Sequence, residues 1–392
     1  MLSSKPRLKF MLAAGLILAL ASVAIAYGMV HYLADKQFEQ AQERFMLLNS
    51  LRKQALTDYF KTAEAELTFW SLNEELTARQ VELVDLWQNA AAQQGEPGAG
   101  LRKLYIESNP HPAGARHQLS DAGDGSAYSA LHARLHPLAK KFVTERGYYD
   151  LFLISPDGDV FYTVEKESDF GSNLKTGTWK HTGLADVYRR ALSAPPEKGT
   201  VTSDLVAYAP SADAPAMFMA KAMKNGDGDI LGVLAFQLPI DRIGSIMQFT
   251  AGMGDSGETY LVGEDYLMRS ASRFSQQSTV LQTSVETASV KRALAGKQGV
   301  MMMPDYRGVP VLSAYDSMEI DGFRWAILAE IDRDEVLQGA AKSQTRVAGL
   351  MAVFYALAMG SLLFMRPDES AANETVGEFP VSDADDFPEL PG

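Results

Sequence analysis

The chain has 392 residues, a formal net charge of −13 and 46% apolar residues. This length allows two or three domains with real hydrophobic cores, and the acidic balance argues against a nucleic-acid partner, because binding phosphates favours a basic face. The sequence contains no cysteine, which excludes structural disulfides, thiolate metal sites and cysteine nucleophiles.

An uncharged apolar segment near the N-terminus covers residues 10–30 and follows Lys5, Arg7 and Lys9. A helix of about 20 apolar residues spans a bilayer core, so this segment is the predicted first transmembrane helix. The preceding cations predict that residues 1–9 are cytoplasmic and that the chain leaves the cell after residue 30. The small residues of Ala24–Ala26 leave a cleaved signal peptide as the alternative, but the apolar run is longer than the core of such a peptide.

Residues 31–147 are predicted to form a helical stalk and a connecting segment. Apolar residues recur at helical spacing from His31 to about Ala92, in one helix or two. The stalk packs on its own domain alone or also pairs with a second copy, and the pattern does not separate these alternatives. Gly95 to Gly125 is rich in Gly, Pro, Asn and Asp and predicts a loop. A further helix is expected from about Ser126 to just before Gly147.

Residues 148–239 change to strand-like patterns. YYDLFLIS, the turn signal PDGD and DVFYTV predict a β-hairpin. A polar loop and a helix follow. Three more strands are then expected at 200–208, 216–223 and 230–238, giving a single antiparallel sheet with helices on one face.

A second unit of similar order is predicted at residues 240–335. Its expected parts are a short helix, a strand–turn–strand in GETYLVGEDYLMRS, a helix at 284–295, and strands at 299–303, 309–316 and 323–331. Residues 336–346 are predicted to be a linking helix and residues 347–365, uncharged between Arg346 and Arg366, a second transmembrane helix. The acidic tail, residues 366–392, is expected to be disordered.

Several segments in order resemble the double-Cache sensory region of bacterial methyl-accepting chemotaxis receptors and membrane-bound nucleotide cyclases. Among them are LYIESNPHPAG, GYYDLFLISPDGDVFYTVEKESDFGSNLKTG and DYRGVPVLSAY, and the likeness covers roughly residues 100–335. The resemblance implies an α+β fold with a long N-terminal helix and two PAS-like modules, a membrane-distal one at 148–239 and a membrane-proximal one at 240–335. It further implies dimerisation through the long helix and ligand binding in the distal module. The output domain that such receptors carry after the second span is not expected here.

Candidate ligand-binding residues follow from this arrangement. Asp169, Lys175 and Trp179 lie in the loop over the predicted first sheet, with Trp179 as a lid or stacking plate. Side chains two apart on a strand share a face, so Asp204 and Tyr208 are expected together, with Lys221 on the following strand. These groups would hold a polar or zwitterionic molecule, although each is also compatible with a solvent-facing or core position.

Nothing in the sequence predicts catalysis, a cofactor or a metal site. His132 and His136 are four residues apart, but the glutamate of an HExxH zinc motif is missing between them. The sequence therefore predicts a two-pass inner-membrane sensor, with its main domain periplasmic. It would bind a small molecule, form a homodimer and signal to a separate cytoplasmic or membrane protein. The alternative is a membrane-anchored scaffold that uses a Cache-like domain for protein interactions.

Overall fold

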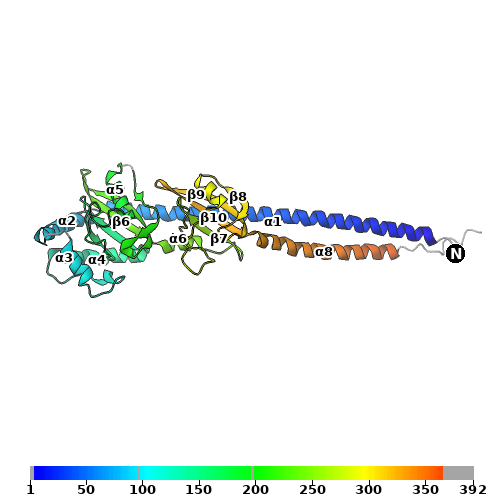
Figure 1. The fold of residues 1–392 in the computed structure, drawn as a ribbon, viewed down its shortest axis with the longest axis horizontal. Coiled ribbons are helices and arrows are strands. Elements are labelled where there is room, and N and C mark those ends of the chain that lie inside the picture. Colours follow the sequence, from blue (N-terminus) through cyan, green and yellow to red (C-terminus); the bar gives the residue numbers. More distant parts are fainter. Residues whose placement is uncertain (1–3, 95–97, 196–197, 365–392) are drawn as a thin grey trace, which may run out of the picture. The chain divides into compact units, whose positions relative to one another are not determined.

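The computed structural model describes residues 4–94, 98–195 and 198–364, and Figure 1 labels their main helices and strands. The acidic tail at 366–392 and residues 1–3 lie outside the described residues. The helices are α1 (Ser4–Ser71), α2 (Glu74–Gln94), α3 (Ala99–Arg102), η1 (Lys103–Glu107), η2 (Arg116–Gln118), α4 (Ala127–Arg146), α5 (Gly183–Ser193), η3 (Ala209–Ser211), α6 (Ile240–Met247), α7 (Ala288–Leu294) and α8 (Arg333–Phe364).

The chain divides into two compact units, and the first consists of residues 1–37 and 337–392. Among the described residues, one helix is long and apolar enough to cross a membrane. Its most apolar window, near the N-terminus, has a mean hydropathy of 2.1. A shorter apolar stretch occupies Thr345–Ala358 within α8. The first predicted span is thus supported by length and composition, and the second span at 347–365 stays a prediction.

The second unit, residues 38–336, contains both sheets. The first sheet consists of β1 (Asp150–Ile154), β2 (Val160–Thr163), β3 (Val201–Thr202), β4 (Val206–Tyr208), β5 (Ala214–Lys224) and β6 (Ile230–Leu238). Its strand order is β2-β1-β6-β5-β3, with β4 paired to β5, and the pairs are antiparallel. The predicted hairpin is confirmed as β1–β2, with Leu153 opposite Tyr162.

Both faces of the first sheet are covered by helices, so the prediction of helices on one face is wrong. Leu151 and Leu153 of β1 pack in the same core as α2 and α4, whereas Phe152 and Ile154 pack with α5. The reason lies in β1 itself, which reads DLFLI and is buried at all five positions. A continuous apolar strand has no face left for water.

The strand expected at 200–208 is interrupted. Ser203–Leu205 lie between β3 and β4 and belong to neither strand, although the Ser203 N–H still donates to the Phe218 carbonyl of β5 at 2.9 Å. Ser203 uses its hydroxyl to accept from the Phe218 backbone N–H at 3.0 Å, and the Asp204 carboxylate accepts from the N–H of Leu205 at 2.7 Å. These side chains replace ladder hydrogen bonds, which is typical of Ser and Asp.

The second sheet has the order β7-β10-β9-β8 and is antiparallel throughout. Its strands are β7 (Glu258–Val262), β8 (Gly299–Pro304), β9 (Pro310–Ile320) and β10 (Phe323–Asp332). The second strand expected in GETYLVGEDYLMRS is reduced to two isolated bridges, Val262–Met268 and Leu267–Ser284. Helix α7 is shorter than the predicted 284–295 segment and begins after the capping residue Thr287, whose hydroxyl accepts from the Val290 N–H.

The C-terminal half of α1 packs along both sheets, as Figure 1 shows for the second unit. Asn49 donates to the Ile327 carbonyl at 3.0 Å, and Phe60 meets the Trp325 ring edge at 6.1 Å. The helical run ends after Ser71, and Asn73 restarts it as α2 by accepting from the Leu76 N–H at 2.9 Å. The predicted stalk is therefore two helices.

Candidate functional site

A group of charged residues is buried in the first sheet's module, where charge is costly. Asp150 begins β1, and Lys166 and Asp169 lie in the loop after β2; all three side chains are 0% exposed. We call these three residues the buried cluster. An ionised group removed from water needs a partner or a shifted pKa, so each member calls for an explanation.

Lys166 occupies an aromatic cage. Its ammonium lies 4.6 Å from the ring centroid of Tyr162, 5.3 Å from Phe170 and 5.9 Å from Tyr105, and it donates to the carbonyl of Thr163. The backbone there is left-handed, with φ at 58°, which turns the side chain inward after the strand. Burial lowers the pKa of Lys166 to about 7, although the nearby carboxylates, Asp150 foremost, oppose that shift. Cation–π attraction stabilises the ammonium in place of water.

The two carboxylates of the buried cluster each have one bonded oxygen. Asp150 Oδ1 accepts from the backbone N–H groups of Leu151 and Val164, both at 2.7 Å. Asp169 Oδ2 accepts from the Tyr208 hydroxyl at 2.6 Å. Burial raises the pKa of Asp169 to about 7, and burial followed by the charge of Asp169 raises the pKa of Asp150.

Within the described residues, the second oxygen of each carboxylate has no hydrogen-bond partner. Asp150 Oδ2, Asp169 Oδ1, Gln237 Oε1 and His132 Nε2 are buried and unpaired. Gln237 of β6 lies directly opposite Asp150 of β1. Because an unpaired buried polar atom costs about 1–3 kcal/mol, a group of them marks a place suited to a bound molecule. Three of these atoms are carbonyl or carboxylate oxygens, so the molecule that fits them carries N–H or O–H donors.

A cavity of about 400 Å³ lies on the α2 and α4 side of the same sheet. Apolar side chains such as Leu76 and Leu135 line it, and its charged members are Glu75, Arg79 and Arg134. Tyr162 belongs both to this cavity and to the cage around Lys166. The size is that of a small-molecule pocket.

The two histidines of α4 are held by hydrogen bonds that need no metal. Their rings stack at 4.6 Å; His132 Nδ1 lies 2.6 Å from the Ser120 carbonyl, and His136 contacts the Tyr162 hydroxyl at 2.9 Å and the His117 carbonyl at 2.7 Å. Burial, followed by the charge of Lys166, lowers the pKa of His136 to about 3 and that of His132 well below its usual value. Both rings are therefore neutral.

The structure brings together two of the six predicted site residues. Asp169 belongs to the buried cluster, and Tyr208 donates a hydrogen bond to it. Lys175 is exposed and donates to the Pro156 carbonyl at 2.9 Å across the hairpin turn. Trp179 packs toward α5 and donates to the Ser168 carbonyl at 3.1 Å.

The other two predicted residues lie elsewhere. Lys221 donates to the Gly199 carbonyl beside a separate cavity of about 320 Å³. Asp204 faces the second sheet, where it accepts from Arg269 at 2.8 Å and from the Trp325 indole N–H at 2.7 Å. Since Asp204 stands outside the strands, it does not share a strand face with Tyr208 as expected.

Sequence reasoning missed Asp150, Lys166 and Gln237. Asp150 carried a weak signal, since it is a charged residue at the start of an otherwise apolar strand. Lys166 stands in a charged loop segment, EKESD, whose composition predicts exposure, and nothing local indicates that it is buried.

Comparison with known proteins finds one matching family model and several solved structures. The sensory domain of the Campylobacter jejuni chemoreceptor Tlp3 is 13% identical, with 78% of this chain and 98% of that one covered and a TM-score of 0.45. The periplasmic sensory domain of the Campylobacter jejuni chemoreceptor Tlp1 is 12% identical, covering 77% and 98%, with a TM-score of 0.41. The ligand-binding domain of the Pseudomonas fluorescens chemoreceptor CtaA, solved with L-serine, is 15% identical, covering 65% and 93%, with a TM-score of 0.37.

Among curated proteins, no relative matches the sequence. The family model, described as a Cache domain, matches residues 35–340, which include both sheets and the C-terminal half of α1. Because that match spans well over half of the chain, this protein belongs to the Cache domain family.

Proposed function

We propose that this protein is a membrane-anchored extracytoplasmic sensor that binds a small polar or zwitterionic molecule in the module of the first sheet. The observation that carries the proposal is the set of buried, unpaired acceptors at Asp150, Asp169 and Gln237 beside the caged ammonium of Lys166. A Cache domain behind an N-terminal apolar helix is the second support.

The chemistry of the site favours a ligand with both signs of charge. An ammonium or hydroxyl group would donate to the free oxygens of Asp150 and Asp169, and a carboxylate would pair with Lys166. The bound ligand would then replace the water molecules that these charged side chains lost on burial. The apolar wall of the adjoining cavity would take the ligand's side chain.

The signal would pass from the first sheet to the second through Asp204, which binds Arg269 and Trp325. It would reach α8 where Glu335 accepts from the N–H groups of Asp255 at 3.0 Å and Ser256 at 2.7 Å. A ligand shifts such an equilibrium only through its different affinity for the two states. We further propose that α8 continues into a second span, that the domain is periplasmic and homodimeric, and that a signalling protein reads the movement.

A thermal-shift screen of metabolites tests the proposal, with the full chain in lipid nanodiscs. We expect at least one zwitterionic metabolite to raise the melting temperature of the wild type and to lose that effect in Asp169→Asn. The matched control is Asp227→Asn, in the exposed β5–β6 turn, which should respond like the wild type. If no small molecule shifts the wild type, the sensor proposal fails. The scaffold function would then be favoured by a stable partner that cross-links to the chain regardless of added metabolites.

A further inference from the structure

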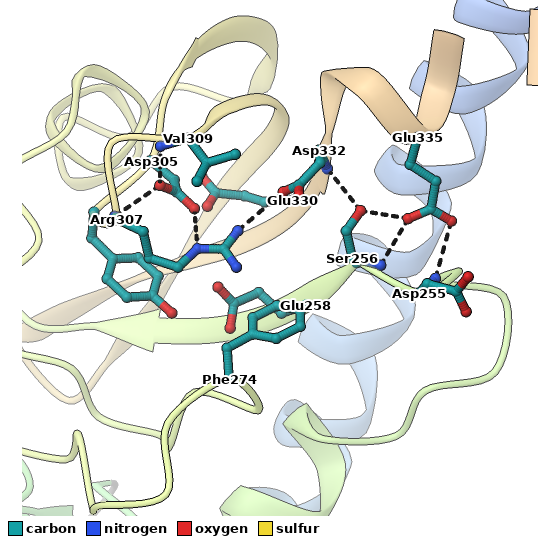
Figure 2. Close-up of polar contacts among 12 residues, drawn as sticks. Asp255, Ser256, Glu258, Phe274, Asp305, Arg307, Val309, Glu330, Asp332 and Glu335 are labelled. Carbon is teal, nitrogen blue, oxygen red and sulfur yellow. Dashed lines mark hydrogen bonds and ion pairs between the residues drawn. The ribbon is translucent and has the colours of Figure 1, made fainter. Parts of the chain in front are cut away.

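Three carboxylates meet inside the second sheet's module. Glu258 of β7 lies directly opposite Glu330 of β10, and Asp305 follows β8 in the turn to β9. One oxygen from each lies within 4.8 Å of the others. The residues are only 1%, 1% and 5% exposed, and Figure 2 shows their side chains converging. We call these residues the carboxylate triad.

Arg307 supplies positive charge at this place and pairs with one member of the triad, Asp305. Its guanidinium bonds Asp305 at 2.6 Å and Asp332 at 3.1 Å, and it lies 4.5 Å from the ring centroid of Phe274 (Figure 2). The two glutamates receive hydrogen bonds from neutral hydroxyls, Ser272 to Glu258 and Tyr260 to Glu330, both at 2.8 Å. Arg307 is therefore paired with two aspartates, whereas neither glutamate is bonded to a cationic side chain among the described residues.

Each glutamate keeps one buried oxygen with no partner in the described part of the chain. These atoms are Glu258 Oε1 and Glu330 Oε1. The hydroxyl of Ser313 is 0% exposed, and Ser313 lies directly across from Glu330 on β9. It forms no well-aligned hydrogen bond among the described residues, but it is near enough to Glu330 to favour the ionised carboxylate as a hydrogen-bond donor. Unpaired buried oxygens aimed into a carboxylate cluster need a cation or protons.

We propose that the carboxylate triad binds a hard divalent cation, with Ca²⁺ as the best fit and the Ser313 hydroxyl as a neutral ligand. The donor set is oxygen only, which suits Ca²⁺ or Mg²⁺ over softer metals. Ca²⁺ takes oxygens at about 2.3–2.6 Å, so two of its ligands can be up to roughly 5 Å apart, and the triad meets this limit. The site differs from the buried cluster in every residue, so the two tests are independent.

Protonation of the glutamates is the competing explanation for the buried oxygens. Burial raises the pKa of Glu330 to about 7 and raises that of Glu258. Cation binding would have to displace these protons, so the affinity for Ca²⁺ should fall as the pH drops below 7. Titrating the metal-free protein with Ca²⁺ separates a cation site from a site that holds protons only.

The first experiment measures the melting temperature of the full chain in nanodiscs, freed of metal by chelation, against added CaCl₂ or MgCl₂. We expect Ca²⁺ at about 100 times its Kd to raise the wild-type value by roughly 5 °C or more. Glu330→Gln should raise the metal-free melting temperature, because it removes a buried charge, and weaken Ca²⁺ binding by about tenfold or more, because affinity follows ligand charge. The control Glu319→Gln, whose side chain is 68% exposed, should behave as wild type.

Arg307→Gln is expected to change the Ca²⁺ affinity in the opposite direction to Glu330→Gln. It therefore tests the proposal by a gain of binding instead of a loss. Removing the guanidinium takes away a competing positive charge, so Ca²⁺ should bind this variant more tightly than the wild type. The proposal is overturned if neither cation shifts the wild type, if Glu330→Gln binds Ca²⁺ as tightly as wild type, or if Arg307→Gln binds it more weakly.

Discussion

Asp169→Asn is expected to stabilise the metabolite-free protein in a way that depends on pH. Burial raises the pKa of Asp169 from 3.8 to about 7, whereas the unfolded chain has the ordinary value. Between these pH values the folded state keeps a proton that the unfolded state has lost. The free energy of unfolding therefore falls as the pH rises from about 4 to about 7, and the loss is complete above 7.

The size of the effect follows from the shift. Roughly three pKa units at ~1.4 kcal/mol each give an upper limit of ~4 kcal/mol at pH 8. Asparagine carries no charge to bury, and its carbonyl oxygen can still accept from Tyr208. The difference in unfolding free energy between variant and wild type should thus be near zero at pH 4 and rise to between ~1 and ~4 kcal/mol at pH 8.

Urea unfolding of the full chain in nanodiscs, followed by tryptophan fluorescence at several pH values, measures this difference. Comparing the variant with the wild type at each pH cancels the titration of other buried groups, Glu330 included. Asp227→Asn serves as the exposed control and should show no pH-dependent difference. A gain that is the same at pH 4 and pH 8, or a variant less stable than wild type at pH 8, would refute the assignment of a raised pKa to buried Asp169.

Two further changes test the packing that holds the sites. Asp204→Asn should cost ~3 kcal/mol, since the side chain of Arg269 is only 2% exposed and would lose the more buried of its two carboxylate partners. Urea unfolding measures this loss. Gly232→Ala should cost ~2 kcal/mol or more, because a Cβ there would lie 2.5 Å from the Ile154 carbonyl oxygen in the first sheet. Its melting temperature reports the change.

Each of these variants has a matched control. Asp265 also binds Arg269, at 2.9 Å, but its side chain is 48% exposed, so Asp265→Asn should cost less than ~1 kcal/mol. At Gly226, in the β5–β6 turn, a Cβ would have nothing within 4 Å, so Gly226→Ala should be close to neutral. Equal losses in variant and control would contradict the proposed contacts.

Local patterns in the sequence predicted the parts of the structure that depend on near neighbours. The PDG turn made the β1–β2 hairpin readable because Pro, Asp and Gly favour that turn wherever the chain goes afterwards. The α4 helix begins after Ser126, whose side chain accepts from the Ser129 N–H, and ends at Gly147 in the left-handed region, and both residues are standard boundary signals. The apolar run in α1 is also a local signal, because a candidate span is recognised from its length and composition alone.

Only the tertiary structure decided which polar residues are buried. Lys166 lies in a charged loop, and its position inside an aromatic cage depends on Tyr105, Tyr162 and Phe170 from separate elements. The carboxylate triad likewise joins three residues spread over more than seventy positions. They meet because β7 pairs with β10, and because the β8–β9 turn that holds Asp305 adjoins the end of β9 that pairs with Asp332 of β10. Sequence periodicity reports which face of an element is apolar, but the desolvation of a charge depends on everything packed around it.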